Sequence, residues 1–326
     1  MKANDTNERK PRVLAVVGPT AGGKTALSIA LAKALGGEVV SFDSMQIYRG
    51  MDIGTAKPTV AEQDGVPHHL IDFVDPFRSY SCAEYARDAR AIIENITVRA
   101  KLPVLCGGTG LYLDAVLLGG SFDETPFDAA VRDKWNAIAA ERGAQVVHDA
   151  LRAVDPESAD AIHPNNVKRV IRALEIYECC GVPKSELDRR SRERGLCYDA
   201  CVIGLRYHSR ERLYSRIDQR VDMMLKDGLL DETKRLLDGG VFEHNATAAQ
   251  AIGYKELLGY LRGECTLDAA VDSLKLATRH YAKRQMTWFA AKDYVRWVYA
   301  DDEDGTMRNF DDILTEALAL AREVPV

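Results

Sequence analysis

The segment GPTAGGKT, residues 18–25, combines small residues with a lysine and a threonine in the pattern G-x-x-x-x-G-K-[ST]. Small residues let several backbone N–H groups converge on one phosphate, and a helix that begins directly after them adds a partial positive charge. Lys24 supplies a full positive charge, and the Thr25 hydroxyl can bind Mg²⁺. We therefore predict a phosphate-ester site here, formed by Gly18, Pro19, Thr20, Ala21, Gly22, Gly23, Lys24 and Thr25. The pattern does not identify the phosphate ester.

Asp43 is a carboxylate that could act on a ligand at this loop. It ends EVVSFD, residues 38–43, which we interpret as a strand adjacent to the strand before the loop. Ligands bind at the carboxyl edge of such sheets, so the Asp43 side chain is expected there. Three roles stay open: it caps the following turn with Ser44, binds Mg²⁺ as in a kinase, or acts as a general base. The loop-rich segment 44–80 favours a larger second substrate than a compact nucleotide kinase accepts.

Two further groups could contact a ligand at the same edge. The turn GGTG, residues 107–110, follows a strand-like run and opens a helix, so Thr109 is expected to be the N-cap of that helix. Arg212, Arg216 and Arg220 recur every four residues and share one helix face. Such a stripe is typical of a solvated face.

The elements that must position these residues alternate between short apolar runs and helical patterns. Apolar runs predict strands at 13–17, 38–43, 103–108, 200–207 and 294–300. Helical patterns cover 24–35 and 83–100. This alternation is typical of an α/β fold with a parallel, doubly wound sheet flanked by helices.

The middle of the chain has a different pattern. Residues 127–180 show helical periods without strands, and residues 183–200 are charged and irregular. We therefore predict a phosphate-loop catalytic core formed by residues 1–121 and 200–326. Residues 122–199 are predicted to be an all-helical insertion.

The bulk composition is that of an ordinary globular protein. Of 326 residues, 46% are hydrophobic and 28% charged, with a net charge of −6. No apolar run is long enough for a membrane span, and the polar N-terminus does not resemble a signal peptide, so we expect a cytoplasmic location. The seven cysteines form no CxxC pair, which argues against a zinc site. His68 and His69 are neighbours that point to opposite sides of an extended segment, so they are not expected to share a metal.

Six blocks, GPTAGGKT, DSMQIYRGMDIGTAKP, HHLID, GGTGLY, HPNNVKRVIRALEI and KRQMTWF, follow one another between residues 12 and 300. In sequence and order they resemble the blocks of the bacterial tRNA dimethylallyltransferase family, also called tRNA isopentenyl-diphosphate transferases. The second and fourth blocks are not general features of phosphate loops, so the resemblance is specific. It implies a P-loop NTPase-like parallel sheet flanked by helices.

The resemblance implies a reaction in which no phosphoryl group moves. In this family the loop binds the diphosphate of dimethylallyl diphosphate, with Mg²⁺ on Thr25. The dimethylallyl group passes to N6 of adenosine 37, next to the anticodon, in tRNAs that read codons beginning with U, giving N6-isopentenyladenosine and diphosphate. Breaking the allylic C–O bond builds negative charge on diphosphate, which Lys24 and Mg²⁺ would stabilise.

The resemblance also assigns residues. Asp43 becomes the general base for the N6 proton, Thr109 lies where donor and adenine meet, and Arg220 contacts the diphosphate. With Lys24 they form the expected catalytic set. The expected tRNA contacts, to the anticodon stem-loop, are Asp43, Ser44, Met45, Gln46, Thr109, Arg132, Lys168, Arg169, Val170, Ile171, Arg172, Lys283, Arg284 and Gln285. We expect a monomer with no membrane partner.

Three other functions remain open at this stage. A small-molecule or nucleotide kinase would bind and turn over ATP, with Asp72 or Asp75 as weak candidates for its metal ligand. A non-catalytic tRNA-binding protein would keep the phosphate-binding loop but catalyse no reaction. Transfer to free adenine nucleotides is the third, and the helical insertion and basic clusters favour tRNA over it.

Overall fold

The computed structural model describes residues 10–119 and 128–323. Its chain divides into two compact units. One consists of Met1–Leu113 together with Tyr198–Val326, and the other of Asp114–Cys197. We describe each unit by itself.

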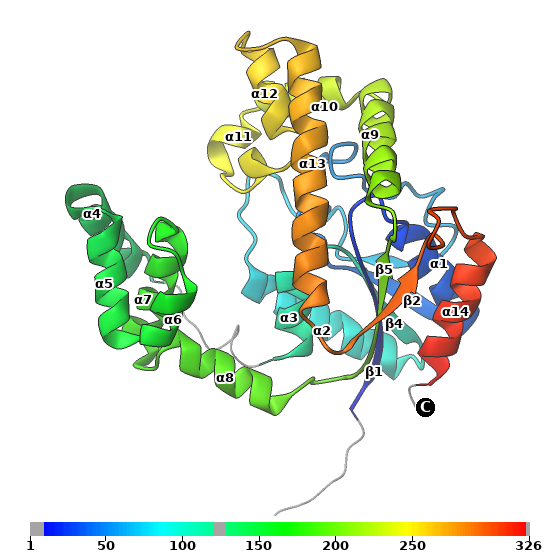
Figure 1. Ribbon diagram of the computed structural model, residues 1–326, viewed down its shortest axis with the longest axis horizontal. Helices are drawn as coiled ribbons and strands as arrows, with labels where there is room; N and C mark the ends of the chain where they lie inside the picture. The colour runs from blue at the N-terminus through cyan, green and yellow to red at the C-terminus, as the bar shows by residue number, and fades with distance from the viewer. Residues whose placement is uncertain (1–9, 120–127, 324–326) are drawn as a thin grey trace, which may run out of the picture. The chain divides into compact units, whose positions relative to one another are not determined.

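A six-stranded sheet forms the centre of the first unit (Figure 1). The strands are β1 Arg12–Val17, β2 Gly37–Ser41, β3 His68–His69, β4 Leu102–Cys106, β5 Asp199–Arg206 and β6 Val295–Tyr299. They lie in the order β3-β2-β4-β1-β5-β6, and every neighbouring pair is parallel. The predicted α/β class with a parallel sheet is confirmed.

The strand order corrects one prediction. β2 is not adjacent to β1, because β4 lies between them: Val104 is in register with Leu14 of β1 on one side and with Val39 of β2 on the other. The carboxyl end of β4 therefore separates the end of β1 from the end of β2. The chain order does not reveal this, because the crossover from β1 to β2 skips the position next to β1, which β4 fills later.

Helices cover both faces of the sheet (Figure 1). α1 (Lys24–Leu35) and α14 (Phe310–Arg322) pack together on one face, over a core of aliphatic strand residues. α2 (Cys82–Val98) lies on the other face, against β2 and β4, and begins with a capping box formed by Ser81 and Glu84. α3 (Gly110–Leu117) follows β4.

The last third of the chain adds helices beyond the carboxyl edge of the sheet. They are α9 Arg210–Lys226, α10 Leu229–Asp238, α11 Val241–His244, a 3₁₀ turn at Ala248–Gln250, α12 Lys255–Leu261 and α13 Leu267–Ala290. The long helix α13 runs beside α9 and α12 (Figure 1).

In the second unit, the regular elements among the described residues are all helices. Its helices are α4 Ala129–Arg142, α5 Ala144–Val154, α6 Pro156–Ala161, α7 Val167–Cys180 and α8 Lys184–Arg194. Its core is formed mainly by α5 and α7, with Val147 and Leu151 packed against Val170 and Leu174. In neither unit does a described helix combine the length and the apolar character that crossing a bilayer requires.

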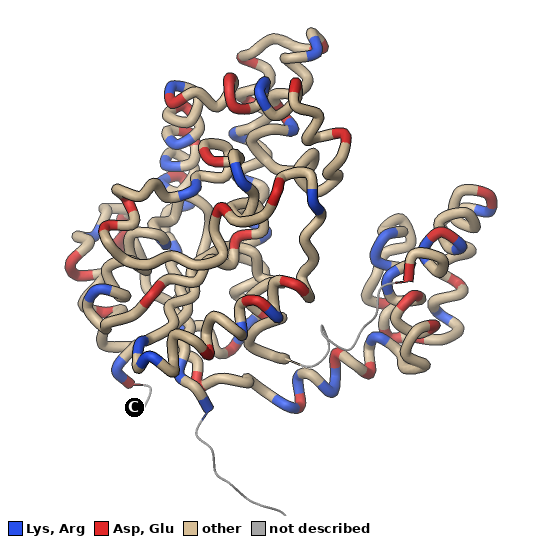
Figure 2. The backbone as a smooth tube through the Cα atoms, turned by 180° about the vertical axis from the view of Figure 1, so that it is seen from behind, with Lys and Arg blue, Asp and Glu red and all other residues tan. Residues whose placement is uncertain are grey.

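Helix α8 corrects a second prediction, because the segment 183–200 was expected to be irregular. Only Ser191 of α8 is buried, so the sequence carries no apolar stripe. Figure 2 shows positive and negative segments alternating along this helix. Ion pairs one turn apart stabilise it, namely Lys184 with Asp188, Arg190 with Glu186 and Arg189 with Glu193. Such pairs stabilise a helix without producing the hydrophobic period by which helices are recognised.

Candidate active site

The glycine-rich loop, residues 18–25, joins β1 to α1 at the carboxyl edge of the sheet. Gly18 has a φ of +142° and lies against β5, where an added Cβ would be 2.6 Å from the Leu205 carbonyl oxygen. Gly23 is left-handed, with a φ of 95°, and is the N-cap residue of α1. The positive end of α1 and the loop amides are thus brought to one place, an arrangement that suits an anion.

Three side chains from the C-terminal half of the chain hold this loop by its backbone. Their contacts are Gln285 Oε1 with the Thr20 N–H at 2.7 Å, the Arg216 Nε–H with the Ala21 carbonyl at 3.0 Å, and the Tyr207 hydroxyl with the Gly22 carbonyl at 3.3 Å. Because the loop has no strand or helix partners for these groups, side chains from elsewhere must supply them.

Lys24 carries the positive charge of the loop in a confined setting. Its Nζ donates to the Pro19 carbonyl at 2.7 Å. Burial, helped by the positive charge of Arg220, lowers the pKa of Lys24 to about 8, while Cys106 and Asp43 act in the opposite direction. Burial also lowers the pKa of Arg220, with Asp43 opposing the change. Lys24, Asp43 and Arg220 therefore act electrostatically on one another.

Asp43 begins a turn, residues 43–46, that follows β2 and that we call the Asp43 turn. Its Oδ1 accepts hydrogen bonds from the N–H groups of Met45 at 2.9 Å and Gln46 at 3.4 Å. The carboxylate thus caps the turn, which is one of the three roles left open by the sequence. Its Oδ2 makes no hydrogen bond to any residue that the structure describes. Capping by one oxygen leaves the other able to accept a proton from a ligand.

Thr109 links the end of β4 to the Asp43 turn. Its Oγ1 accepts from the Ser44 N–H at 3.1 Å and donates to the Ser44 hydroxyl at 3.3 Å. Thr109 directly precedes α3, and its carbonyl accepts from the N–H groups of Tyr112 at 2.9 Å and Leu113 at 3.3 Å, so it takes the predicted N-cap position while its hydroxyl is engaged by Ser44. The position of β4 between β1 and β2 explains why Thr109 lies near both the glycine-rich loop and Asp43.

The cavity at this edge has a volume of about 480 Å³. Among the predicted site residues, those that line it are Thr20, Asp43, Ser44, Met45, Arg220 and Arg284. Aliphatic side chains, including Ile217, Val221 and Leu274, form another part of the lining. Lys24, Thr25 and Thr109 are not among its lining residues. The cavity therefore combines an anion-binding side, a carboxylate and an apolar wall.

Tyr281 on α13 is a lining residue that the sequence did not single out. Burial raises the pKa of its hydroxyl, and the charge of Asp43 raises it further, while contacts with Thr109 and Gln285 act in the opposite direction. The phenol therefore stays protonated beside the carboxylate. No sequence signal marks it, because an aromatic residue in an amphipathic helix is normally a core residue.

Gln285 corrects a predicted tRNA contact. The side chain is 4% exposed, and besides Thr20 it reaches the Gly108 carbonyl, to which Nε2 donates at 3.1 Å. It therefore fastens the glycine-rich loop to the turn after β4 instead of facing a nucleic acid. Gln46 also bonds within the protein, donating from Nε2 to the carbonyls of Thr55 at 3.2 Å and Ala56 at 3.1 Å.

The neighbouring cations on α13 remain accessible. Lys283 and Arg284 are both exposed, and the Arg284 guanidinium lies 5.6 Å from the centre of the Tyr281 ring. Trp288 is 38% exposed, and an added Cβ at Gly110 would lie 2.3 Å from its indole, so the ring packs on the start of α3. Trp288 is thus partly packed and partly solvent-exposed.

In the second unit, the predicted tRNA contacts divide by burial. Val170 and Ile171 are 0% and 3% exposed in the helical core, so the prediction that their side chains contact tRNA is wrong. Arg132 and Arg172 both pair with the buried carboxylate of Glu175. The sequence could have predicted that Val170 and Ile171 are buried, because the apolar residues of α7 recur at the spacing of one helix face.

Lys168 and Arg169 lie at the start of α7 and are exposed. Among the described residues neither forms an ion pair. Their charges are therefore available to an anionic partner.

Comparisons with known proteins find two family models that match the chain. The family model described as IPP transferase matches residues 46–292, and the one described as isopentenyl transferase matches residues 11–73. A tRNA dimethylallyltransferase from Geobacillus thermodenitrificans (strain NG80-2) is 50% identical over 293 residues, which cover 90% of this chain and 92% of the relative. One from Bacillus velezensis is 51% identical over 291 residues, which cover 89% and 91%.

Two solved structures are similar over most of the chain. The tRNA isopentenylpyrophosphate transferase from Bacillus halodurans has a TM-score of 0.70 and 46% identity, covering 96% of this chain and 98% of its own. A eukaryotic dimethylallyltransferase, described as acting on tRNA, has a TM-score of 0.76 and 32% identity, covering 90% and 75%. The predicted P-loop NTPase-like fold and the predicted family are thereby confirmed. The chain belongs to the IPP transferase family of prenyl-transferring enzymes, the family of the tRNA dimethylallyltransferases.

Proposed function

We propose that the chain transfers the dimethylallyl group of dimethylallyl diphosphate to N6 of adenosine 37 in tRNAs that read codons beginning with U. The observation that carries this proposal is the shared cavity, in which Thr20 of the glycine-rich loop, Arg220 and Asp43 all take part. An anion-binding side and a carboxylate in one cavity suit a reaction that releases diphosphate and a proton together.

The donor would be held by its charged end. The diphosphate lies in the glycine-rich loop, where backbone N–H groups, Lys24 and Arg220 face it. Within the described residues no cluster of three or more His, Cys, Asp or Glu could hold a metal ion. Thr25 would instead hold Mg²⁺ through its hydroxyl, and the ion would neutralise negative charge on the leaving group.

The acceptor amine would be activated by Asp43. Because Oδ1 is already fixed by the backbone of Met45 and Gln46, Oδ2 is the oxygen that accepts the N6 hydrogen bond and then the proton. The N6–C1 bond forms as the C1–O bond of the donor breaks, and the electron pair of that bond leaves on diphosphate. The apolar wall formed by residues such as Ile217 and Val221 suits the methyl groups of the donor.

We also propose that exposed cations of the second unit, Lys168 and Arg169, bind the anticodon stem-loop through its phosphates. Phosphate contacts of this kind orient a nucleic acid without reading its sequence. Arg284, exposed and lining the cavity, is proposed to contact the RNA near the acceptor base.

The test is a transfer assay with labelled dimethylallyl diphosphate, without ATP, in parallel reactions containing unmodified tRNA, the same tRNA with guanosine at position 37, or free AMP. Label in the first tRNA alone is the expected result. Label in AMP would reassign the acceptor to free nucleotides. A separate reaction with labelled ATP tests the alternative: phosphorylation of a substrate there, with no dimethylallyl label in any acceptor, would contradict the proposal in favour of a kinase.

A further inference from the structure

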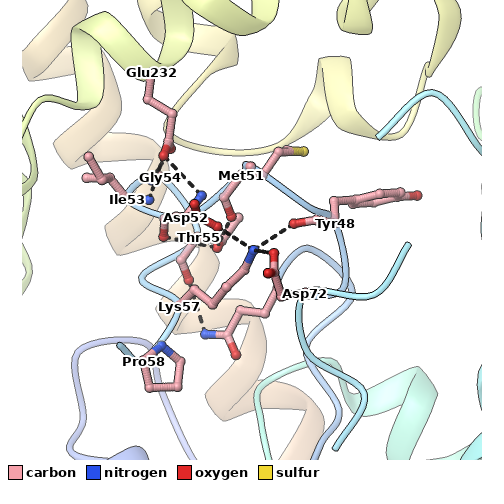
Figure 3. Close-up of polar contacts among 12 residues, drawn as sticks. Tyr48, Met51, Asp52, Ile53, Gly54, Thr55, Lys57, Pro58, Asp72 and Glu232 are labelled. Carbon is pink, nitrogen blue, oxygen red and sulfur yellow. Dashed lines mark hydrogen bonds and ion pairs between the residues drawn. The ribbon is translucent and has the colours of Figure 1, made fainter. Parts of the chain in front are cut away.

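A loop that lines the cavity is held by a single buried carboxylate (Figure 3). The 52–56 loop, residues 52–56, contributes Gly54, Thr55 and Ala56 to the cavity wall. Glu232 on α10 is 6% exposed and meets this loop from above in the view of Figure 3.

The carboxylate accepts hydrogen bonds from three consecutive backbone amides. Glu232 Oε2 accepts from the N–H groups of Asp52 at 3.1 Å and Ile53 at 3.0 Å, and Oε1 accepts from that of Gly54 at 3.0 Å. Successive N–H groups that converge in this way form a concave site for an anion. Here the anion is a side chain about 180 residues away in the sequence.

Tyr254 completes the shell of donors. Its hydroxyl donates to Glu232 Oε1 at 2.7 Å, and its ring packs so closely on Gly54 that an added Cβ there would lie 2.4 Å from Cζ. Burial raises the pKa of Tyr254, and the negative charge of Glu232 raises it further, so the phenol remains a donor. With four donors the buried carboxylate needs no cation to offset its desolvation.

The far end of the loop has an anchor of its own. Lys57 donates to the Tyr48 carbonyl at 2.7 Å and pairs with Asp52 and Asp72, as Figure 3 shows. Lys57 and these three partners all lie within residues 48–72, so this anchor does not reach the last third of the chain. Glu232 is thus the group whose hydrogen bonds fix the 52–56 loop to the last third of the chain, with the Tyr254 ring packed beside it on Gly54.

The 52–56 loop is in turn bonded to the Asp43 turn. Gln46 donates from Nε2 to the carbonyls of Thr55 and Ala56, and its backbone N–H donates to Asp43 Oδ1 at 3.4 Å. A continuous series of hydrogen bonds therefore leads from Glu232 through the loop and Gln46 to Asp43. The glycine-rich loop depends on other side chains, such as Gln285 and Arg216, and among the described residues none of its hydrogen bonds involves Glu232.

We propose that Glu232 is a positioning residue for the transfer reaction, which holds the 52–56 loop so that Gln46 and the Asp43 carboxylate keep their reactive arrangement. This inference rests on the proposed function, in which Asp43 accepts the N6 proton. Because Glu232 serves the Asp43 turn and not the glycine-rich loop, its loss lowers the rate of transfer and spares the binding of the donor.

The test is the Glu232→Gln variant, which keeps the shape of the side chain but places an NH₂ group against a backbone or phenol donor. We expect kcat for tRNA to fall on the order of 10²-fold, the typical result of a small displacement of a reacting group. The KM for tRNA and the Kd for dimethylallyl diphosphate, measured without tRNA, should stay at wild-type values. Hydrogen exchange of the amides in residues 52–54 should become faster.

The matched control is Asp231→Asn, which changes an exposed acid on the same helix and should behave as wild type. Assays are run well below the melting temperature, so that the folded fraction is the same for all variants. Tyr254→Phe removes one of the four hydrogen bonds, keeps the ring, and should give a smaller loss of kcat. If Glu232→Gln does not fold, Tyr254→Phe carries the same test, and an unchanged kcat in that variant would overturn the inference.

A double-mutant cycle tests the route through Gln46. If Glu232 acts through this residue, Glu232→Gln should add little to the loss of kcat that Gln46→Leu causes alone. Fully additive losses, or a donor Kd that rises as much as kcat falls, would contradict the inference. A wild-type protein that does not label tRNA would instead contradict the proposed function.

Discussion

Replacement of Asp43 by asparagine separates its role in capping the turn from its proposed role as the proton acceptor. In the wild type, Oδ1 accepts hydrogen bonds from the backbone of Met45 and Gln46, while Oδ2 is left for the substrate. An asparagine can keep its amide oxygen at the first position and so preserve the turn. Only the negative charge, and with it the capacity to take a proton, is lost.

The expected magnitude follows from that difference. General-base catalysis typically contributes about 10²–10⁴-fold to a rate, which corresponds to about 2.7–5.4 kcal/mol of activation free energy. We expect kcat to fall within this range for Asp43→Asn, with the KM values for donor and tRNA changed far less. The Ser44 contacts with Thr109 do not involve the carboxylate and should persist.

One side effect must be removed by the choice of pH. The charge of Asp43 raises the pKa of Lys24, which is about 8, so its loss lowers that pKa further. The variant would then lose the Lys24 charge at a lower pH than the wild type. Transfer should therefore be compared at about pH 6.5 as well as near neutrality, so that Lys24 is protonated in both proteins.

A magnesium titration and a matched variant decide the interpretation. Asp75→Asn alters an exposed aspartate whose Oδ1 also accepts a backbone N–H, from Phe77 at 2.9 Å, and it should leave kcat unchanged. If excess Mg²⁺ restored Asp43→Asn to wild-type kcat, Asp43 would be a metal ligand and our reasoning would be refuted. A deficit that persists at every Mg²⁺ concentration supports the general base.

Three further predictions concern binding and stability. Protonated Lys24 attracts the diphosphate, and its pKa is about 8, so the KM for the donor should rise as the pH passes above 8, and Lys24→Ala should abolish this dependence. Arg169→Glu should weaken tRNA binding and reduce its salt dependence, with Arg142→Glu on exposed α4 as the control; equal losses in both would contradict a specific contact. Gln285→Leu leaves the Thr20 amide without its partner, so the free energy of unfolding should fall by about 1–3 kcal/mol and donor affinity should fall with it, as denaturant and binding titrations would measure.

The parts of the fold that could be predicted depend on neighbours in the sequence. Short apolar runs mark β1, β2, β4 and β5, because consecutive residues of each strand are buried on both faces. The glycine-rich loop is equally local, since its conformation demands glycine at Gly18 and Gly23. These signals need no knowledge of which strands become neighbours.

The parts that could not be predicted depend on contacts between distant segments. The position of β4 between β1 and β2 is decided by pairing, so Thr109 could be placed at the ligand edge but not beside Ser44. Gln285 is polar and follows two exposed cations in the sequence, which is typical of a surface residue, yet its side chain is buried. Glu232 lies in a helix whose sequence contains other acids and carries no distinguishing mark.

The buried polar residues of this site share one physical cause. Backbone N–H groups can converge on a substrate only in loops that leave regular structure, and such loops lack the partners that a helix or sheet would provide. When the loops are also buried around a cavity, side chains must satisfy the remaining groups, as Gln285 does for the glycine-rich loop and Glu232 for the 52–56 loop. Both side chains come from helices of the last third of the chain, so these helices take part in setting the geometry of loops that carry the chemistry in the first third. Substitutions of such residues should therefore change the rate of transfer, although the residues themselves are not proposed to contact either substrate.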